Sequence, residues 1–432
     1  MRRLLIAAGA AAAVAGCVAG LLQLGPDTSR PPARQAAAPT AAPTGSRSAG
    51  ISAVDTARRA TAAHPDDPAV WAGLARAEIE QARTTLDASR LDAAERALRR
   101  SLALDAVDNY GAVTGQGLLA NARHEFAKGR AYGLHATRMA PDRPDGYAVL
   151  ADAEIQLGNY PQARTAVQRT LDIAPGTAAY SRAAYDLETH GRPEDAAIAL
   201  QRALNSAVTD DERAFTETRL GDLAWSRGEV DRAGRHYRRA LAAVPDHPYG
   251  QAGIARVTAA RGNTGKALEL YARLVERTPL PQFLLETLEL RRAAGDARRG
   301  GEQTALSAQT RMAHADGGPV DPHLILHAAD HGDPELAVEL GRRAWKHARS
   351  VIVADALGWA LHRAGQNTEA LAYARRAAAT GWKNALFLHH RGTIEQALAM
   401  PEGSPHLSEA AALNPYPFPF PSSTVLTETG SR

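Results

Sequence analysis

Three histidines are the residues of this sequence best spaced for chemistry. His323, His327 and His331 stand four residues apart, so a helix would carry them on one face, where two imidazoles can share a metal ion. The alternative is structural: His331 lies just before Gly332, and a partly cationic ring suits the last turn of a helix. We adopt the second interpretation and expect no metal ion.

A glycine-rich segment at 262–266 superficially matches a phosphate-binding loop. That loop requires a glycine five residues before its Gly-Lys pair, then Ser or Thr, and it follows a strand. Here Ala260 and Ala267 occupy those two places, and both flanks have helical periodicity. The segment is therefore predicted to be a turn between two helices.

No combination of side chains in this sequence predicts catalysis. Cys17 is the only cysteine, and the G-x-S-x-G and H-E-x-x-H patterns of common hydrolases are missing. We therefore expect a non-catalytic protein without a cofactor, with a helical enzyme as a third possibility behind two binding functions.

A repeated sequence motif predicts how the side chains are arranged along the chain. Its copies share small or apolar residues, a glycine turn, an aromatic ring and a proline in fixed order. One copy has Leu220, Gly221, Ala224, Gly228, Ala233, Tyr237, Ala240 and Pro245, and the next has Ile254, Ala255, Thr258, Gly262, Ala267, Tyr271, Leu274 and Pro279. The period, about 34 residues, is typical of a helix-turn-helix unit, which must stack on its neighbours to bury its apolar faces.

This pattern resembles the tetratricopeptide repeat, whose leucine-glycine pair, alanines, aromatic ring and closing proline all find counterparts here. The resemblance implies an all-α, right-handed superhelical solenoid of about ten hairpins over residues 51–415. It also implies a protein or peptide partner in the concave groove. The runs at 329–332, 356–362 and 414–415 are similar to exported or membrane-anchored tetratricopeptide proteins of actinobacteria.

The N-terminus is predicted to be an export segment, residues 1–25, followed by a linker rich in Pro, Ala and Thr, residues 26–50. Arg2 and Arg3 precede an apolar run from Leu4 to Leu22, with positive charge on the side that stays inside. Three interpretations stay open: a membrane-spanning anchor, a lipoprotein attached through Cys17, and a cleaved signal. All three place the repeats outside the cytoplasmic membrane. Residues 416–432 are predicted to form a Pro-rich tail.

Composition narrows the class of partner. The chain has 432 residues, 45% of them hydrophobic, and a net charge of +3. A nearly neutral chain of this length lacks the concentrated basic surface that nucleic acid requires. We therefore expect no nucleic-acid partner.

The resemblance also implies which residues line the concave groove, because the family lines it from fixed positions of each first helix. Acids outnumber bases at these positions, and large rings lie among them, so we expect a neutral or basic partner. The candidate site is Tyr185, Phe215, Asp222, Trp225, Tyr249, Arg256, Asp355, Trp359 and His362. Further acids at these positions are Asp145, Asp152, Glu188, Glu289 and Asp330, and further bases are Arg292 and Arg363.

An alternative function uses the opposite face. Arginine recurs just before the second alanine of the motif, at a position that faces outward. The set is Arg100, Arg169, Arg202, Arg239, Arg273, Arg343 and Arg376. Solvated side chains are the simplest interpretation, and attraction to an anionic lipid or cell-envelope polymer is the alternative.

The N-terminal segment is testable by two changes. Deleting residues 1–25 should leave a soluble, folded repeat region in the cytoplasm, because the apolar run is removed and no disulfide is needed. Cys17→Ser should abolish membrane attachment of a lipoprotein and leave a spanning helix attached, as membrane fractionation would show. Full-length protein found only in the cytosol would contradict both forms of anchor.

Overall fold

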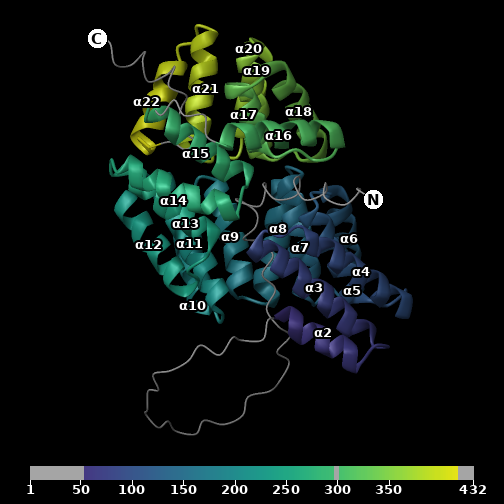
Figure 1. Cartoon of the computed structure of the whole chain (residues 1–432). Coiled ribbons are helices and arrows are strands. Elements are labelled where there is room, and N and C mark those ends of the chain that lie inside the picture. Colours follow the sequence, from purple (N-terminus) through teal and green to yellow (C-terminus); the bar gives the residue numbers. More distant parts are fainter. Residues whose placement is uncertain (1–52, 296–300, 417–432) are drawn as a thin grey trace, which may run out of the picture.

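The computed structural model describes residues 53–295 and 301–416, and in these ranges every regular element is an α-helix (Figure 1). The predicted anchor and linker, and residues 417–432 of the tail, lie outside the described residues. The helices are α2 (Ala53–Ala63), α3 (Pro68–Thr85), α4 (Ser89–Leu104), α5 (Tyr110–Ala122), α6 (Phe126–Met139), α7 (Pro144–Gln156), α8 (Tyr160–Ile173), α9 (Thr177–Thr189), α10 (Pro193–Ser206), α11 (Asp210–Ser226), α12 (Val230–Ala243), α13 (Pro248–Ala260), α14 (Thr264–Arg277), α15 (Pro281–Ala293), α16 (Gly301–Asp316), α17 (Pro322–His331), α18 (Pro334–His347), α19 (Val351–Arg363), α20 (Asn367–Ala377), α21 (Ala385–Ala397) and α22 (Gly403–Leu413).

After α2, these helices form ten hairpins, each with an odd-numbered first helix and an even-numbered second helix. The all-α solenoid of about ten hairpins is therefore confirmed, while its right hand stays a prediction. Small residues let the paired helices approach: a Cβ added to Gly221 would lie 2.6 Å from the Tyr237 ring, and Ala233 is fully buried. The repeat motif thus marks helix contacts, as its spacing predicts.

The chain coils far enough for its two halves in sequence to touch: α3–α12, named the lower half, and α13–α22, named the upper half, of which α13 and α14 lie beside α11 and α12 in Figure 1. In Figure 1 the later helices, from α15 onward, lie stacked on the earlier ones. Each first helix of the lower half ends in a turn residue with positive φ. An added Cβ would meet Arg349 at Gly158 and Gly381 at Gly191, both in connections between hairpins of the upper half, and Leu413 at Gly228, at the end of the last hairpin. These turn residues are Leu86, His124, Gly158, Gly191 and Gly228. We call this line of contacts the seam.

Backbone contacts hold the middle of the seam. The amide of Arg349 donates a hydrogen bond of 2.7 Å to the carbonyl of Gln156. Two residues further on, Val351 donates its amide to the Tyr160 hydroxyl at 2.9 Å. Gly158 has no room for a side chain, because an added Cβ would lie 2.5 Å from the Arg349 carbonyl oxygen.

Side chains close both ends of the seam. At the first turn, Leu86 packs against an apolar cluster that contains Leu280. At the last turn, the buried Asn414 donates from Nδ2 to the Trp225 carbonyl at 2.8 Å, and the Tyr416 ring lies 6.4 Å from the indole. The seam therefore runs along the whole lower half of the superhelix.

The first hairpin has an extended first helix, as the sequence spacing predicts, and among the other first helices only α11, with 17 residues, is comparably long. Its first helix, α3, has 18 residues where α5, α7, α9 and α13 have 13. The extra length carries Arg83 across the concave side, where its guanidinium lies 5.8 Å from the Phe215 ring on α11. The lengthened helix thus closes one side of the interior.

Seam closure can be tested at two glycines that share a backbone conformation. Gly158 and Gly365 have φ of 76° and 77°, so alanine at either position costs about 1 kcal/mol in backbone strain. Only Gly158→Ala also pushes against Arg349, because an added Cβ at Gly365 meets nothing within 4 Å. We expect faster hydrogen exchange of the Arg349 amide in Gly158→Ala and an unchanged rate in Gly365→Ala. Equal rates in the two variants would contradict the seam.

Candidate functional site

The concave side of the superhelix encloses a bore lined by first helices. Two adjoining cavities of about 420 Å³ and about 230 Å³ occupy it. Asp222 and Tyr249 line both cavities, and so does Arg219. The bore is therefore one continuous polar and aromatic space.

The larger cavity is built by the unusual length of α3. Arg83 and its neighbours at the end of α3 form one wall, and Phe215 on α11 faces them. His247, at the start of α13, completes the lining, with its Nδ1 accepting the Gly250 amide at 3.2 Å. Burial, together with the charge of Arg83, lowers the pKa of His247 to about 4, so this ring is neutral at pH 7.

The smaller cavity is shared by the two halves of the superhelix. Tyr185 and Trp225 line it from the lower half, and Ile352, Trp382 and Phe387 line it from the upper half. The Tyr185 and Trp382 rings meet edge to face, with centroids 6.3 Å apart. Because the rings come from opposite sides of the seam, this cavity exists only while the seam is closed.

Pairs of charged or hydrogen-bonding side chains connect each first helix to the next along the bore. From α7 to α21, all seven neighbouring pairs of first helices carry such a contact. We call the set the ladder: Asp152–Arg182, Glu188–Arg219, Asp222–Arg256, Arg256–Glu286, Glu289–His331, Asp330–Arg363 and Asp355–His390. The acids predicted for the groove are thus largely paired within the protein.

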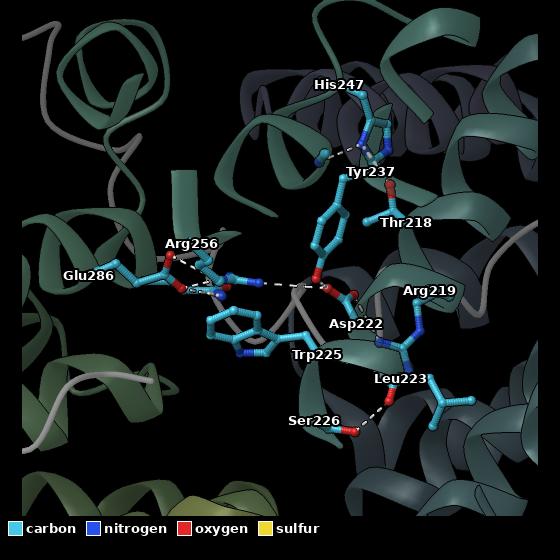
Figure 2. A network of polar contacts seen from close by, with 12 residues as sticks. Thr218, Arg219, Asp222, Leu223, Trp225, Ser226, Tyr237, His247, Arg256 and Glu286 are labelled. Atoms are coloured by element: carbon cyan, nitrogen blue, oxygen red, sulfur yellow. Dashed lines mark hydrogen bonds and ion pairs between the residues drawn. The ribbon is translucent and has the colours of Figure 1, made fainter. Parts of the chain in front are cut away.

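The centre of the ladder is a buried network (Figure 2). The Arg256 guanidinium donates two hydrogen bonds to the Glu286 carboxylate, at 2.7 and 3.2 Å. It also lies 3.6 Å from Asp222. Two second-helix tyrosines at the same repeat position support the carboxylates: Tyr237 donates to Asp222 at 2.9 Å and Tyr271 to Glu286 at 2.8 Å. Every charge in the network therefore has a fixed partner.

Burial and the neighbouring charges shift the pKa values of this network. Burial is the main reason that the pKa values of Tyr237 and Tyr271 lie well above 10, and the nearby carboxylates add to it. Burial alone would lower the pKa of Arg256, but Glu286 and the two tyrosines raise it well above its usual value. Arg256 and both hydroxyls therefore keep their protons across the physiological range.

Seven of the nine predicted site residues line the bore. Phe215, Asp222 and Tyr249 face the larger cavity, and Asp222 and Tyr249 also face the smaller one. The others in the smaller cavity are Tyr185, Trp225, Arg256 and Asp355. Several of these side chains are buried, including Tyr185 and Trp225, so their rings form the walls of a closed site.

Trp359 and His362, the other two predicted residues, line neither of these two cavities. The Trp359 indole stacks on His390 with centroids 4.2 Å apart and donates to Asp330 at 3.0 Å. The indole is thereby engaged between α17, α19 and α21. His362 bonds from Nδ1 to Asn367 at 2.7 Å.

The sequence prediction misses some residues that line the bore, among them Arg83, Trp382 and Phe387. Arg83 comes from the extra length of α3, and Trp382 from a connection between hairpins. Neither place belongs to the repeat frame, so the frame offers no signal for them. The pairs of the ladder can be sought in the sequence, because each acid and its basic partner lie nearly one repeat apart.

The three spaced histidines turn to three different partners. His323 contacts Asp321 at 3.0 Å, His327 contacts Gln303 at 3.1 Å, and His331 pairs with Glu289. Within the described ranges, no group of three or more His, Cys, Asp or Glu side chains is arranged to hold a metal ion.

Some of the recurring convex arginines serve the fold. Each of three donates to a backbone carbonyl in or just after the helix that precedes its own hairpin, where helix carbonyls lack partners. Arg100 reaches Pro65 at 3.4 Å, Arg169 reaches Pro141 at 3.5 Å, and Arg343 reaches His314 at 3.0 Å. A guanidinium that bonds the end of the preceding helix is less available to an external anion.

Among the described residues, no helix combines the length and the apolar character needed to cross a bilayer. The predicted anchor at residues 1–25 lies outside them.

The fold and the bore define the class of the protein: a helical-repeat solenoid with a concave binding surface. Residues 148–212 and 218–280 match the family model for the tetratricopeptide repeat. These four hairpins are therefore tetratricopeptide repeats, as their motif predicts.

The chain is similar to parts of much longer curated proteins. It is 29% identical over 243 residues to cellulose synthase 1 operon protein C of Komagataeibacter xylinus, covering 53% of this chain and 16% of that protein. It is 26% identical over 223 residues to cellulose synthase operon protein C of Pseudomonas fluorescens (strain SBW25), covering 50% of this chain and 17% of that protein. The chain thus spans about one sixth of the length of these relatives.

Among solved structures, the chain is similar to PilW, a widely conserved type IV pilus biogenesis factor. The identity is 18% and the TM-score 0.39, with 48% of this chain and 93% of that chain covered.

The central network can be tested by removing its cation. Arg256→Met should lower the free energy of unfolding by about 3 kcal/mol, because Glu286 stays buried without its counter-charge. Arg261→Met is the matched control: it breaks a pair with Asp231 whose side chains are 46% and 79% exposed, which is worth about 0–1 kcal/mol. Urea denaturation would measure both. Equal losses would show that the network is not buried as described.

Proposed function

We propose that this protein is a non-catalytic scaffold that binds an extended segment of a protein or peptide in its bore. The smaller cavity carries this proposal, because seven first helices or their connections converge on it with aromatic rings and fixed charges. Concave sites with apolar walls and a few placed polar groups are the usual form of a binding site. Tetratricopeptide repeats commonly bind protein or peptide partners, which supports the same function.

The lining indicates the chemistry of the segment. Four carboxylates and two guanidiniums face the smaller cavity: Glu188, Asp222, Glu286, Asp355, Arg219 and Arg256. The excess of carboxylates disfavours an acidic segment, whereas an aromatic or apolar side chain fits between the rings. Since the ladder already neutralises much of this charge, a neutral segment suits the bore at least as well as a basic one.

We place the scaffold on the outer side of the cytoplasmic membrane, attached through its N-terminus. The support is the charged and apolar pattern of residues 1–25 with Cys17 inside it. The similarity to two proteins named for cellulose synthase operons is compatible with a role in assembling the cell envelope.

The alternative is an assembly factor that binds an anionic polymer or lipid through the convex arginines. Its support is that Arg202, Arg239 and Arg273 remain exposed at one repeat position. The bonds that Arg100, Arg169 and Arg343 make to neighbouring carbonyls count against it. Peptide binding in the bore is therefore the stronger proposal.

Fluorescence of the bore tryptophans can decide between the two functions. The full-length protein is titrated with three peptides of equal length that share one Phe-containing core and carry neutral, Lys-rich or Glu-rich flanks. We expect the first two to change Trp225 and Trp382 emission and the third to have little effect. Tyr249→Ser should weaken binding at least tenfold, because Tyr249 is only partly buried and lines both cavities.

The matched control is Arg202→Ser with Arg239→Ser on the convex face. This double variant should bind the neutral and basic peptides like the parent. Polyglutamate serves as the anionic polymer probe. Salt-sensitive polyglutamate binding that disappears in the double variant, with no response to any peptide, would favour the alternative.

A further inference from the structure

The seam leaves a matching unpaired edge on each half of the superhelix. All turns within hairpins project to one side of a solenoid, and all connections between hairpins project to the other. In the seam, turns of the lower half meet connections of the upper half. The described turns of the upper half, at 261–263, 364–366 and 398–402, and the connections of the lower half therefore face outward. We call them the turn edge and the connection edge.

Three turns of the turn edge repeat the backbone of the seam, and at two of them an added side chain would meet nothing within the described residues. Gly262, Gly365 and Ala399 have φ of 81°, 77° and 53°, like the seam turns. Whereas a Cβ at Gly158 or Gly191 would strike the opposite connection, a Cβ at Gly262 or Gly365 meets no atom within 4 Å. The turn edge thus has the same backbone shape as the turns of the seam, but no connection packs against it.

The connection edge carries an independent signal. Val107, in the connection between α4 and α5, is 78% exposed, and Val208, between α10 and α11, is 81% exposed. They are two of three strongly exposed large apolar residues in the described part of the chain. In the seam, the apolar residues of connections are covered: Leu280, Val320 and Ala348 are at most 7% exposed. Val107 and Val208 thus occupy positions whose counterparts in the connections of the seam are buried.

We propose that the connection edge of one copy of this chain binds the turn edge of a second copy, continuing the seam from molecule to molecule. The partner is a second copy because the seam itself shows that these two edges fit each other. The contact is head-to-tail, so it leaves a free edge at each end and can add further copies. The surface is separate from the bore, and the proposal does not depend on what the bore binds.

Two variants block one edge each without touching the core. The connection-edge variant is Val107→Asp with Val208→Asp. The turn-edge variant is Asn263→Glu with Gln366→Glu, at positions that begin α14 and α20 without a side-chain capping bond. The control is Ile198→Asp, a 55% exposed residue of α10 away from both edges. Far-UV circular dichroism checks folding, and single substitutions replace any double variant that loses helix.

The experiment mixes full-length chains that carry two different affinity tags, in mild detergent, and measures capture of one by the other. We expect the parent and the Ile198→Asp control to capture themselves, and each edge variant to lose at least tenfold in self-capture. The two edge variants should still capture each other, because one intact edge of each remains. Sedimentation of that mixture should stop at a dimer, whereas the parent grows with concentration.

Three results would overturn the proposal. A parent that stays monomeric, with Val107 and Val208 protected from exchange, would mean that another segment of the chain covers the connection edge. Self-capture that survives in the connection-edge variant would place the contact elsewhere. Loss in one edge variant with full self-capture by the other would indicate a two-fold contact between like edges.

Discussion

The ladder is the interaction on which the curvature of this solenoid depends. Small residues let two helices of a hairpin touch, but they do not fix the angle between one hairpin and the next. A pair such as Asp152–Arg182, with side chains 0–2% exposed and atoms 2.9 Å apart, admits one spacing only. Burying such a pair gains little stability once desolvation is counted, so its effect lies in geometry. We infer that seven such contacts in sequence set a common spacing of first helices along the bore.

A common spacing of the first helices affects the whole superhelix and not only a single repeat. Equal rotations accumulate from hairpin to hairpin, until the chain returns over its own turns. There the positive-φ residues fit under the connections, and Gly158 must be glycine because Arg349 lies where its Cβ would be. The seam closes the bore on one side and brings Trp382 to Tyr185. Local charge pairs thus determine a contact between residues far apart in sequence.

The sequence predicts contacts that recur in every repeat. It misses contacts between distant repeats, which depend on the accumulated rotation of the hairpins. Gly221, Ala233 and Tyr237 take the predicted roles, because each role is settled within one hairpin and its neighbour. Seven of nine candidate residues line the bore for the same reason. Trp382 escapes prediction because its contact with Tyr185 lies across the seam. Trp359, which the same frame assigns to the groove, packs on the next first helix, where a histidine at 390 gives its indole a stacking partner.

The seam and the bore are energetically linked, because the smaller cavity has walls on both sides of the seam. Tyr185 and Trp225 belong to the lower half, and Trp382 and Phe387 to the upper half. A segment that contacts both walls binds the closed superhelix more tightly than an opened one, so binding must stabilise the seam by that difference in affinity. By the same linkage, a change that loosens the seam weakens binding according to the fraction of closed superhelix that it removes. Gly158→Ala, which touches neither cavity, should therefore weaken peptide binding, while Gly365→Ala should not.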